Sequence, residues 1–339
     1  MTERELFDEI FSLHGNYQDD LLKSVGEKIL LGHQHDLMTE KIADAITLIL
    51  VFAHEKECGP VEVAREMASV VLHRLENSKD LDFDEVMMAA YLVGHANNPA
   101  KLAKRLLNKL TGYKDDPNYD SKRKGIKTAI HLNSLLFEIR SDKPCEDNFN
   151  FHYFALLKMY KSDKGVSAIY RSATLIRKGI LDQEVSLVRQ GLDALDDLSE
   201  KELVRLLISE VARYGLFRGK GFDKELYNFI MGRNVQKLRK AKGMSVDDLA
   251  KQMGVDIKVV VPIERGKADV SLYAAHIARH LEVSIGDIYE HIDFVNQLLN
   301  QLGPEKFEDQ KPERPNVVVY DEVYKKLHDV RNKYRLFLT

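Results

Sequence analysis

The stretch from Met231 to Tyr289 constrains the fold more than any other part of the chain, because helix-stop residues recur in it at short intervals. Gly243 and Gly254 each follow a run whose apolar residues have helical spacing. Glycine is the usual residue just beyond the end of a helix. The pattern therefore predicts short helices joined by tight turns, and a helix, a short turn and a second helix is an arrangement that can present the later helix to a DNA major groove.

Helix-start residues fall between these glycines. Ser245, followed three residues later by Asp248, predicts a capping box at the start of the second helix. Asp256 predicts the cap of a third helix that starts at Ile257. The starts and stops thus agree with one another over the whole stretch.

These residues resemble the lambda/Cro-type helix-turn-helix, often called the Xre family. The resemblance covers residues 231–290 of a chain of 339 residues. It implies duplex DNA binding and transcriptional control, commonly as a dimer, and a structural ion pair between Arg239 and Glu264. The matching pieces are Leu238-Arg239, Gly243, Ser245, Asp248-Leu249-Ala250, Gly254-Val255, Ile263-Glu264-Arg265-Gly266-Lys267, Ser271-Leu272, Ile277-Ala278, Leu281 and Val283-Ser284.

The third helix departs from what the resemblance implies. Its residues expected to face base edges are Ile257, Lys258 and Val261, of which only Lys258 can donate a hydrogen bond. Specific readout normally uses Arg, Asn or Gln with paired donors or acceptors. The family usually has Gln directly after the second cap, where this chain has Val246. Pro262 predicts that the third helix ends near Val261 or has lost its role in the groove.

Contacts to the DNA backbone are expected from the cations of this module, and Ser245 and Asp256 at the helix starts are further candidate DNA-binding residues. Residues 233–267 hold nine Lys and Arg against four acidic residues, in a chain whose net charge is −3. The candidates for phosphate contact are Arg233, Lys237, Lys240, Lys251 and Lys267. A second basic cluster, from Lys101 to Lys127, offers another phosphate-contacting surface, although an amphipathic helix with a charged loop explains it more simply.

The composition is that of an ordinary soluble protein, with 44% hydrophobic and 30% charged residues. A pI near 6.5 excludes a globally basic nucleic-acid coat, so any DNA binding must come from a local patch. Cys58 and Cys145 form no CxxC pair, which suits a reducing cytoplasm. The longest apolar run, Ala45 to Ala53, is too short for a membrane span, and the charged start favours no signal peptide.

No known catalytic motif occurs in the sequence, so we expect neither an enzyme nor a cofactor. There is no P-loop, GxGxxG, HExxH or GxSxG pattern. The segment His33-Gln34-His35-Asp36 suggests a metal site, but the two histidines of an HxH pair point in different directions in a strand or a helix. We therefore expect no metal.

The rest of the chain predicts an all-α protein. Residues 1–220 are expected to form a large multi-helix domain, an irregular bundle or an α-solenoid, with a possible subdivision near residues 113–147. The helix-turn-helix domain is expected over residues 228–290, and a C-terminal helical extension with a Pro-containing linker over 291–339. Expected helices in the first part are 34–54, 83–93, 101–110, 149–161, 164–178, 182–195 and 199–214, with exposed loops at 112–121 and 141–148.

Apolar residues in the C-terminal extension recur at heptad-like spacing, which favours either dimerisation or packing on the chain's own core. They are Ile288, Ile292, Val295, Leu299 and Leu302, and then Val323, Leu327, Val330 and Tyr334. The preferred interpretation is a cytoplasmic repressor that binds DNA as a homodimer, with a peptide, small-molecule or protein effector on the N-terminal domain. The alternative is an antitoxin-like or antirepressor-like adaptor that docks a partner through the apolar third helix.

Overall fold

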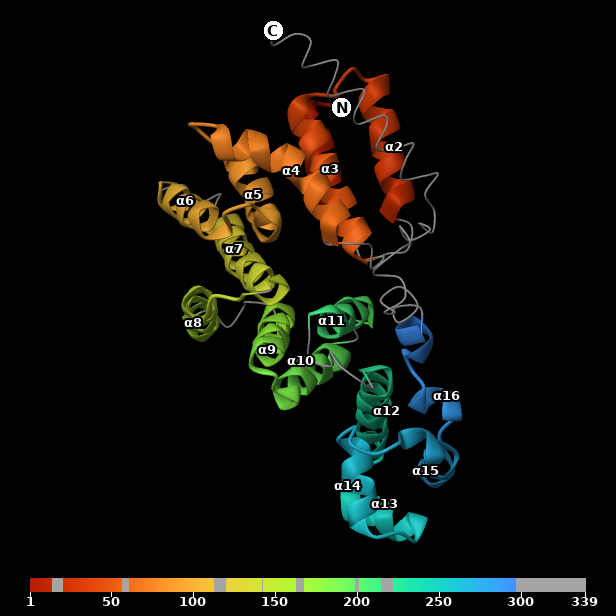
Figure 1. Cartoon of the computed structure of the whole chain (residues 1–339). Helices are drawn as coiled ribbons and strands as arrows, with labels where there is room; N and C mark the ends of the chain where they lie inside the picture. The colour runs from red at the N-terminus through yellow and green to blue at the C-terminus, as the bar shows by residue number, and fades with distance from the viewer. Residues whose placement is uncertain are drawn as a thin grey trace, which may run out of the picture. The chain divides into compact units, whose positions relative to one another are not determined.

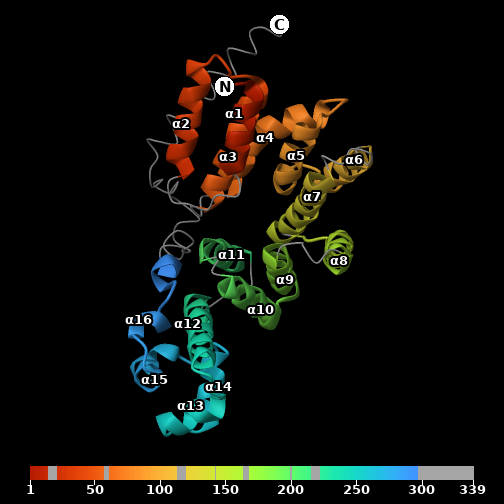
Figure 2. The ribbon, with the colours of Figure 1, turned by 180° about the vertical axis from the view of Figure 1, so that it is seen from behind.

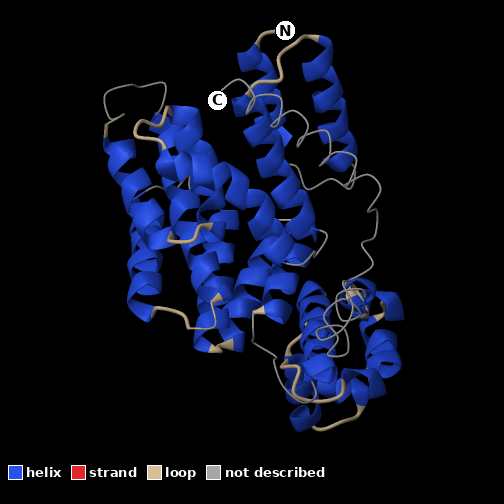
Figure 3. Ribbon diagram, turned by 45° about the horizontal axis from the view of Figure 1, so that its top comes forward, coloured by secondary structure: helices blue, strands red, loops and turns tan. Residues whose placement is uncertain are grey.

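The computed structural model describes residues 1–13, 21–56, 61–112, 120–141, 143–162, 168–198, 201–214 and 222–296. Every regular element in these ranges is helical, so the predicted all-α class is confirmed (Figures 1 and 3). The described residues divide into two compact units, one up to Arg177 and one from Lys178. The two units are described separately below.

The first unit is built on α3, whose apolar residues surround the helix. Ile42, Ile46 and Ile49 are completely buried, as expected for a central helix. The helix begins at Glu40 rather than at Gln34, because the left-handed backbone of Asp36, with φ at 55°, separates it from the preceding helix. The elements are α1 (Glu3–Ser12), α2 (Leu21–Gln34), α3 (Glu40–Lys56), α4 (Val61–Asn77), α5 (Phe83–Leu92), η2 (Val93–His95), α6 (Pro99–Thr111), α7 (Asp120–Arg140), α8 (Glu146–Ser162) and α9 (Ala168–Asp182).

The longest of these helices, α7, was not anticipated from the sequence. The helix starts with the basic stretch Ser121-Lys-Arg-Lys-Gly, and the apolar residues at helical spacing come only after it. The helix packs against α5, α6 and α8, and the views from the front and from behind both place it among them (Figures 1 and 2). These contacts join both sides of the expected subdivision at 113–147 into one unit.

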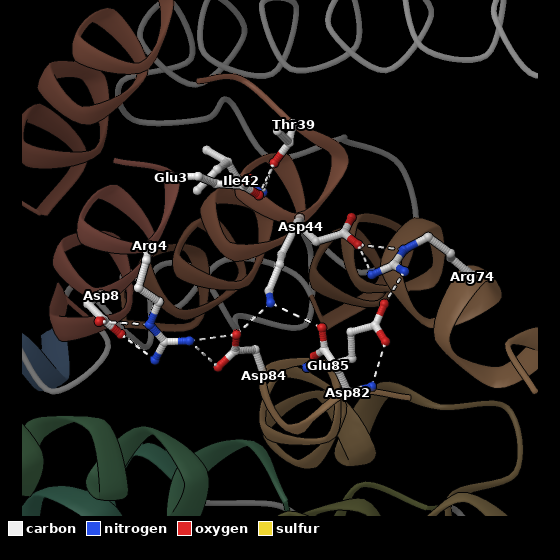
Figure 4. Close-up of polar contacts among 11 residues, drawn as sticks. Glu3, Arg4, Asp8, Thr39, Ile42, Asp44, Arg74, Asp82, Asp84 and Glu85 are labelled. Atoms are coloured by element: carbon white, nitrogen blue, oxygen red, sulfur yellow. Dashed lines mark hydrogen bonds and ion pairs between the residues drawn. The ribbon is translucent and has the colours of Figure 1, made fainter. Parts of the chain in front are cut away.

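Ion pairs connect α1, α3, α4 and α5 at one edge of this unit (Figure 4). The carboxylate of Asp84 lies 2.8 Å from Arg4 and 2.5 Å from Lys41. Arg74 lies 2.7 Å from Asp44 and 2.5 Å from Glu85. Asp44 and Asp84 are buried, and a buried carboxylate destabilises the fold unless a cation and hydrogen bonds compensate it. The network therefore fixes four helices with respect to one another.

A buried histidine pair joins α7 to α8. The Nδ1 atoms of His131 and His152 lie 2.8 Å apart, so one ring donates a hydrogen bond and the other accepts it. Burial, together with the neighbouring His152, lowers the pKa of His131 to about 3, and burial lowers the pKa of His152 to about 4. Both rings are therefore neutral in the folded protein at neutral pH.

The second unit continues from the end of α9 and contains the helices of the helix-turn-helix. Its elements are α10 (Val185–Asp197), α11 (Lys201–Arg213), α12 (Phe222–Ala241), α13 (Val246–Met253), α14 (Ile257–Glu264), η4 (Val270–Leu272), α15 (Ala274–Leu281) and α16 (Ile285–Ile288). The division at Lys178 lies before the expected joint near residue 220 because α10 contacts α12 and α14 through charged side chains. Residues 215–221, which precede α12, lie outside the described residues.

The first three apolar residues of the heptad-like pattern at the C-terminal end pack inside the second unit. Ile288, Ile292 and Val295 are buried within the second unit. The side-chain amide of Asn234 on α12 donates to the main-chain oxygens of Ile288 and Glu290, at 3.0 Å each. These three apolar side chains therefore pack on the chain's own core, and the remainder of the pattern lies outside the described residues.

The neutral histidine pair predicts that the packing of α8 on α7 weakens in acid. The folded-state pKa values lie below the ordinary value of 6.5, so the unfolded state binds more protons. The pair's contribution is complete above about pH 6.5 and is lost as the pH falls toward 4. Amide hydrogen exchange should show the opening free energy of these helices falling by on the order of 2 kcal/mol between pH 7.5 and 5.5. The double variant His131→Leu/His152→Leu should lose this dependence, and an unchanged dependence there contradicts the assignment.

Candidate nucleic-acid interface

The helix α12 begins at Phe222, so Gly232 lies in its interior, where it contacts the end of α14. A Cβ atom at Gly232 would lie 2.2 Å from the main-chain oxygen of Ile263. Gly266, which follows α14 and has a φ of 69°, lies equally close to α12, since a Cβ there would be 2.7 Å from the Cα of Phe229. The two glycines thus let α12 and the end of α14 meet backbone to backbone.

The predicted caps form at the starts of α13 and α14. The hydroxyl of Ser245 accepts from the amide of Asp248 at 3.1 Å, and the Asp248 carboxylate accepts from the amide of Ser245 at 2.9 Å. Asp256 accepts from the amide of Lys258 at 2.8 Å. Gly254 has a φ of 66°, the left-handed conformation that makes the turn between the two helices. The caps and the turn therefore set where α14 begins.

A buried ion pair holds the other end of α14. The guanidinium of Arg239 donates to the two carboxylate oxygens of Glu264 at 2.5 and 2.9 Å, and to the main-chain oxygen of Met244 at 2.6 Å. The hydrogen bond to Glu264 raises the pKa of Arg239. This is the pair that the resemblance implies. The sequence did not indicate that Arg189 on α10 also donates to the main-chain oxygen of Glu264, while its guanidinium lies over the Phe229 ring, 5.5 Å from the ring centre.

Arg233, expected to contact DNA phosphate, is instead buried, and this expectation is corrected. Its side chain is 0% exposed. The guanidinium donates to Asp193 at 2.7 Å and to Asp196, both on α10. Both carboxylates lie far earlier in the sequence, so the local pattern gave no sign of them. Arg233 therefore attaches the helix-turn-helix to α10 and cannot reach a phosphate without unfolding.

The four remaining predicted phosphate contacts lie at the surface. Lys237 is shared between Asp196 at 3.4 Å and Glu290 at 3.6 Å, and Lys251 pairs with Asp247 at 2.5 Å on the same helix. Such exposed pairs contribute only about 0–1 kcal/mol and are readily exchanged for a phosphate. Lys240 and Lys267 are exposed, and no carboxylate in the described parts of the chain pairs with them.

The predicted base-facing residues lie on the outer side of α14. Lys258 is exposed, Ile257 is 40% exposed and Val261 is half-buried. The helix does not end near Val261, since it continues through Pro262 to Glu264. Pro262 is tolerated because its ring is on the outer side, so only one helical hydrogen bond is missing. Arg265, which follows α14 directly, is a further exposed cation on this side.

Part of the second basic cluster has structural partners in the first unit. Arg105 donates to the main-chain oxygens of Leu75 and Glu76 at the end of α4, at 3.1 and 2.7 Å, and also to that of Ser78. Lys109 pairs with Asp80. These contacts favour the simpler interpretation of an amphipathic helix with a charged edge, although Lys101 and Lys104 are exposed.

Two kinds of feature are absent from the described residues. No group of three or more His, Cys, Asp or Glu side chains there is placed to hold a metal ion. None of the described helices is both long enough and apolar enough to cross a membrane.

A comparison with protein families matches residues 234–293 to the Cro/C1-type helix-turn-helix DNA-binding domain. The match covers α12 from Asn234 onward and all of α13, α14, η4, α15 and α16, so the resemblance stated from the sequence is confirmed for this domain. No curated protein and no solved structure shows significant similarity to the chain. The chain therefore contains a Cro/C1-type DNA-binding domain close to its C-terminus.

The close approach at Gly232 predicts a large cost for any side chain there. In Gly232→Ala, the added Cβ would meet a backbone oxygen that cannot move without displacing α14. We expect a loss of roughly 3 kcal/mol in unfolding free energy, measured by calorimetry on the full chain. In the matched control Gly286→Ala the new Cβ has only an ordinary contact at 3.4 Å, so its stability should change little. Equal effects of the two substitutions contradict this account of the packing.

Proposed function

We propose that the protein is a transcriptional repressor that binds duplex DNA through the outer side of α14 and the surrounding lysines. The observation that carries the proposal is the match to a DNA-binding domain together with an exposed outer side of α14 that has lysines and an arginine around it. The proposed target places the protein in the cytoplasm and requires no catalytic residue and no cofactor.

The surface charge of the domain supports this proposal. Arg233 and Arg239 are buried against carboxylates, so neither adds to the positive charge of the surface. Between residues 233 and 267, seven exposed cations then stand against three exposed carboxylates, Asp247, Asp248 and Asp256. The cations are Lys237, Lys240, Lys242, Lys251, Lys258, Arg265 and Lys267. Such a local excess attracts the phosphate backbone independently of base sequence.

Regulation by the rest of the chain is proposed to act through α10. This helix contacts α12 through Arg233 and the end of α14 through Arg189. An effector bound within residues 1–220 would therefore alter operator affinity if it shifted α10, which is a coupling free energy between two sites. We also propose binding as a homodimer, because operators with two half-sites are read by two-fold symmetric dimers.

A protein-docking adaptor is the alternative, and one observation favours it. Ile257 is among the large apolar side chains left exposed, and it lies on the helix that would otherwise read DNA. Against it, Val260 and Ile263 of the same helix are completely buried in the unit and are unavailable to a partner. The exposed apolar area is therefore small.

The proposal predicts duplex binding that weakens steeply with added salt. For a randomised duplex, Lys240→Gln, Lys258→Gln and Lys267→Gln should each lower affinity and reduce the slope of log affinity against log salt by about 1. Lys224, also exposed but paired with Asp269 at 3.1 Å near the start of α12, provides the matched control. Lys224→Gln should leave the slope unchanged. A full-length protein that binds no duplex even at low salt would disprove the proposal and favour the adaptor.

A further inference from the structure

We infer that α14 recognises its DNA site mainly through the C5-methyl groups of thymine, contacted by Ile257 and Val261. The inference rests on the proposed function, since it specifies what the recognition helix reads. It concerns base sequence, whereas the lysines described above act on phosphates.

The burial pattern of α14 determines which side chains can meet a base edge. Val260 and Ile263 are completely buried and Glu264 is 3% exposed, so they define the inner side. At about 100° per residue, the opposite side carries Lys258 and Arg265.

Two apolar side chains lie between these cations and the inner side. Ile257 and Val261 are four residues apart, so they are neighbours on one edge of the helix. Ile257 is 40% exposed in the first turn, the part of a recognition helix that usually reaches base edges. Pro262 is about 100° further around the helix than Val261, on the other side of the two cations, so it is not part of this edge.

This set of side chains can distinguish few features of a base pair. Paired hydrogen bonds to guanine or adenine need Arg, Asn or Gln, and the outer side of α14 has none before Arg265 at its end. A lysine supplies a single charge without fixed direction. The thymine methyl is the apolar group of the major groove, and apolar side chains recognise it by excluding water. The chemistry of α14 therefore fits thymine-containing steps better than any hydrogen-bonding pattern.

The charges on the same helix favour DNA over a protein as the occupant of this surface. Lys258 and Arg265 are seven residues apart, or about 10 Å along the axis. Both are exposed, and neither has a carboxylate partner among the described residues. An apolar surface of two side chains beside such cations is small for protein docking. It matches a groove whose floor carries methyl groups and whose rims carry phosphates.

The test replaces thymine by uracil, which removes the methyl and leaves base pairing and hydrogen-bonding groups unchanged. Sites enriched from a randomised duplex library by the full-length protein are resynthesised with uracil at each thymine in turn. At one or two positions the wild type should bind the uracil site more weakly, by about fourfold for each methyl lost. In Ile257→Ala and Val261→Ala the ratio of thymine-site to uracil-site affinity should fall toward one.

The control Lys267→Gln should weaken both duplexes equally and leave that ratio unchanged. Thermal unfolding of the variants checks that they remain folded, as expected for substitutions at the helix surface. Equal binding of thymine and uracil sites by the wild type would overturn methyl recognition while leaving the proposed function intact. A ratio that stays unchanged in both apolar variants would also overturn it. Binding of neither duplex at low salt would overturn the proposed function and the inference together.

Discussion

The buried carboxylate of Glu264 determines the position of the recognition helix more than any other single group. It is 3% exposed, and both oxygens receive hydrogen bonds from Arg239. The main-chain oxygen of the same residue receives a hydrogen bond from Arg189. A buried carboxylate without a cation would cost several kcal/mol, so the end of α14 is stable only where these guanidiniums can reach it. The helix is thereby fixed to both α12 and α10.

The two glycines make this arrangement possible because they bring the backbones into contact. With a side chain at Gly232 or Gly266, α12 and the exit of α14 would separate, and the Arg239–Glu264 geometry would not close. The packing of the inner side of α14 also explains why this helix continues through Pro262. The proline ring disrupts only the outer side of the helix, whereas the inner side is held by buried apolar side chains and the ion pair. Tertiary contacts here outweigh the local preference of the sequence.

Features set by neighbouring residues could be predicted from the sequence, and features set by distant partners could not. The caps at Ser245 and Asp256 depend on residues within one turn, and they form as expected. The burial of Arg233 depends on Asp193 and Asp196, which are 40 and 37 residues earlier. From the local charge pattern alone, Arg233 is as good a candidate for phosphate contact as the exposed lysines. Only a knowledge of how α10 packs would have separated it from them.

Three arginines of this unit are directed inward for a reason that lies in their chemistry. Arg189, Arg233 and Arg239 point inward, where a planar guanidinium can bridge carboxylates and main-chain oxygens. Burial lowers the pKa of Arg189, and the nearby carboxylates offset that effect only in part.

The inward arginines also determine how much positive charge is left at the surface. The side chains of Asp196 and Glu264 pair with them and are each only 4% exposed, so these carboxylates add little negative charge to the surface. Asp196 lies 3.4 Å from Lys237, which makes this lysine less available than Lys240, Lys258 or Lys267. The excess of positive charge around the outer side of α14 thus arises partly because two carboxylates that would otherwise neutralise it pair with buried arginines.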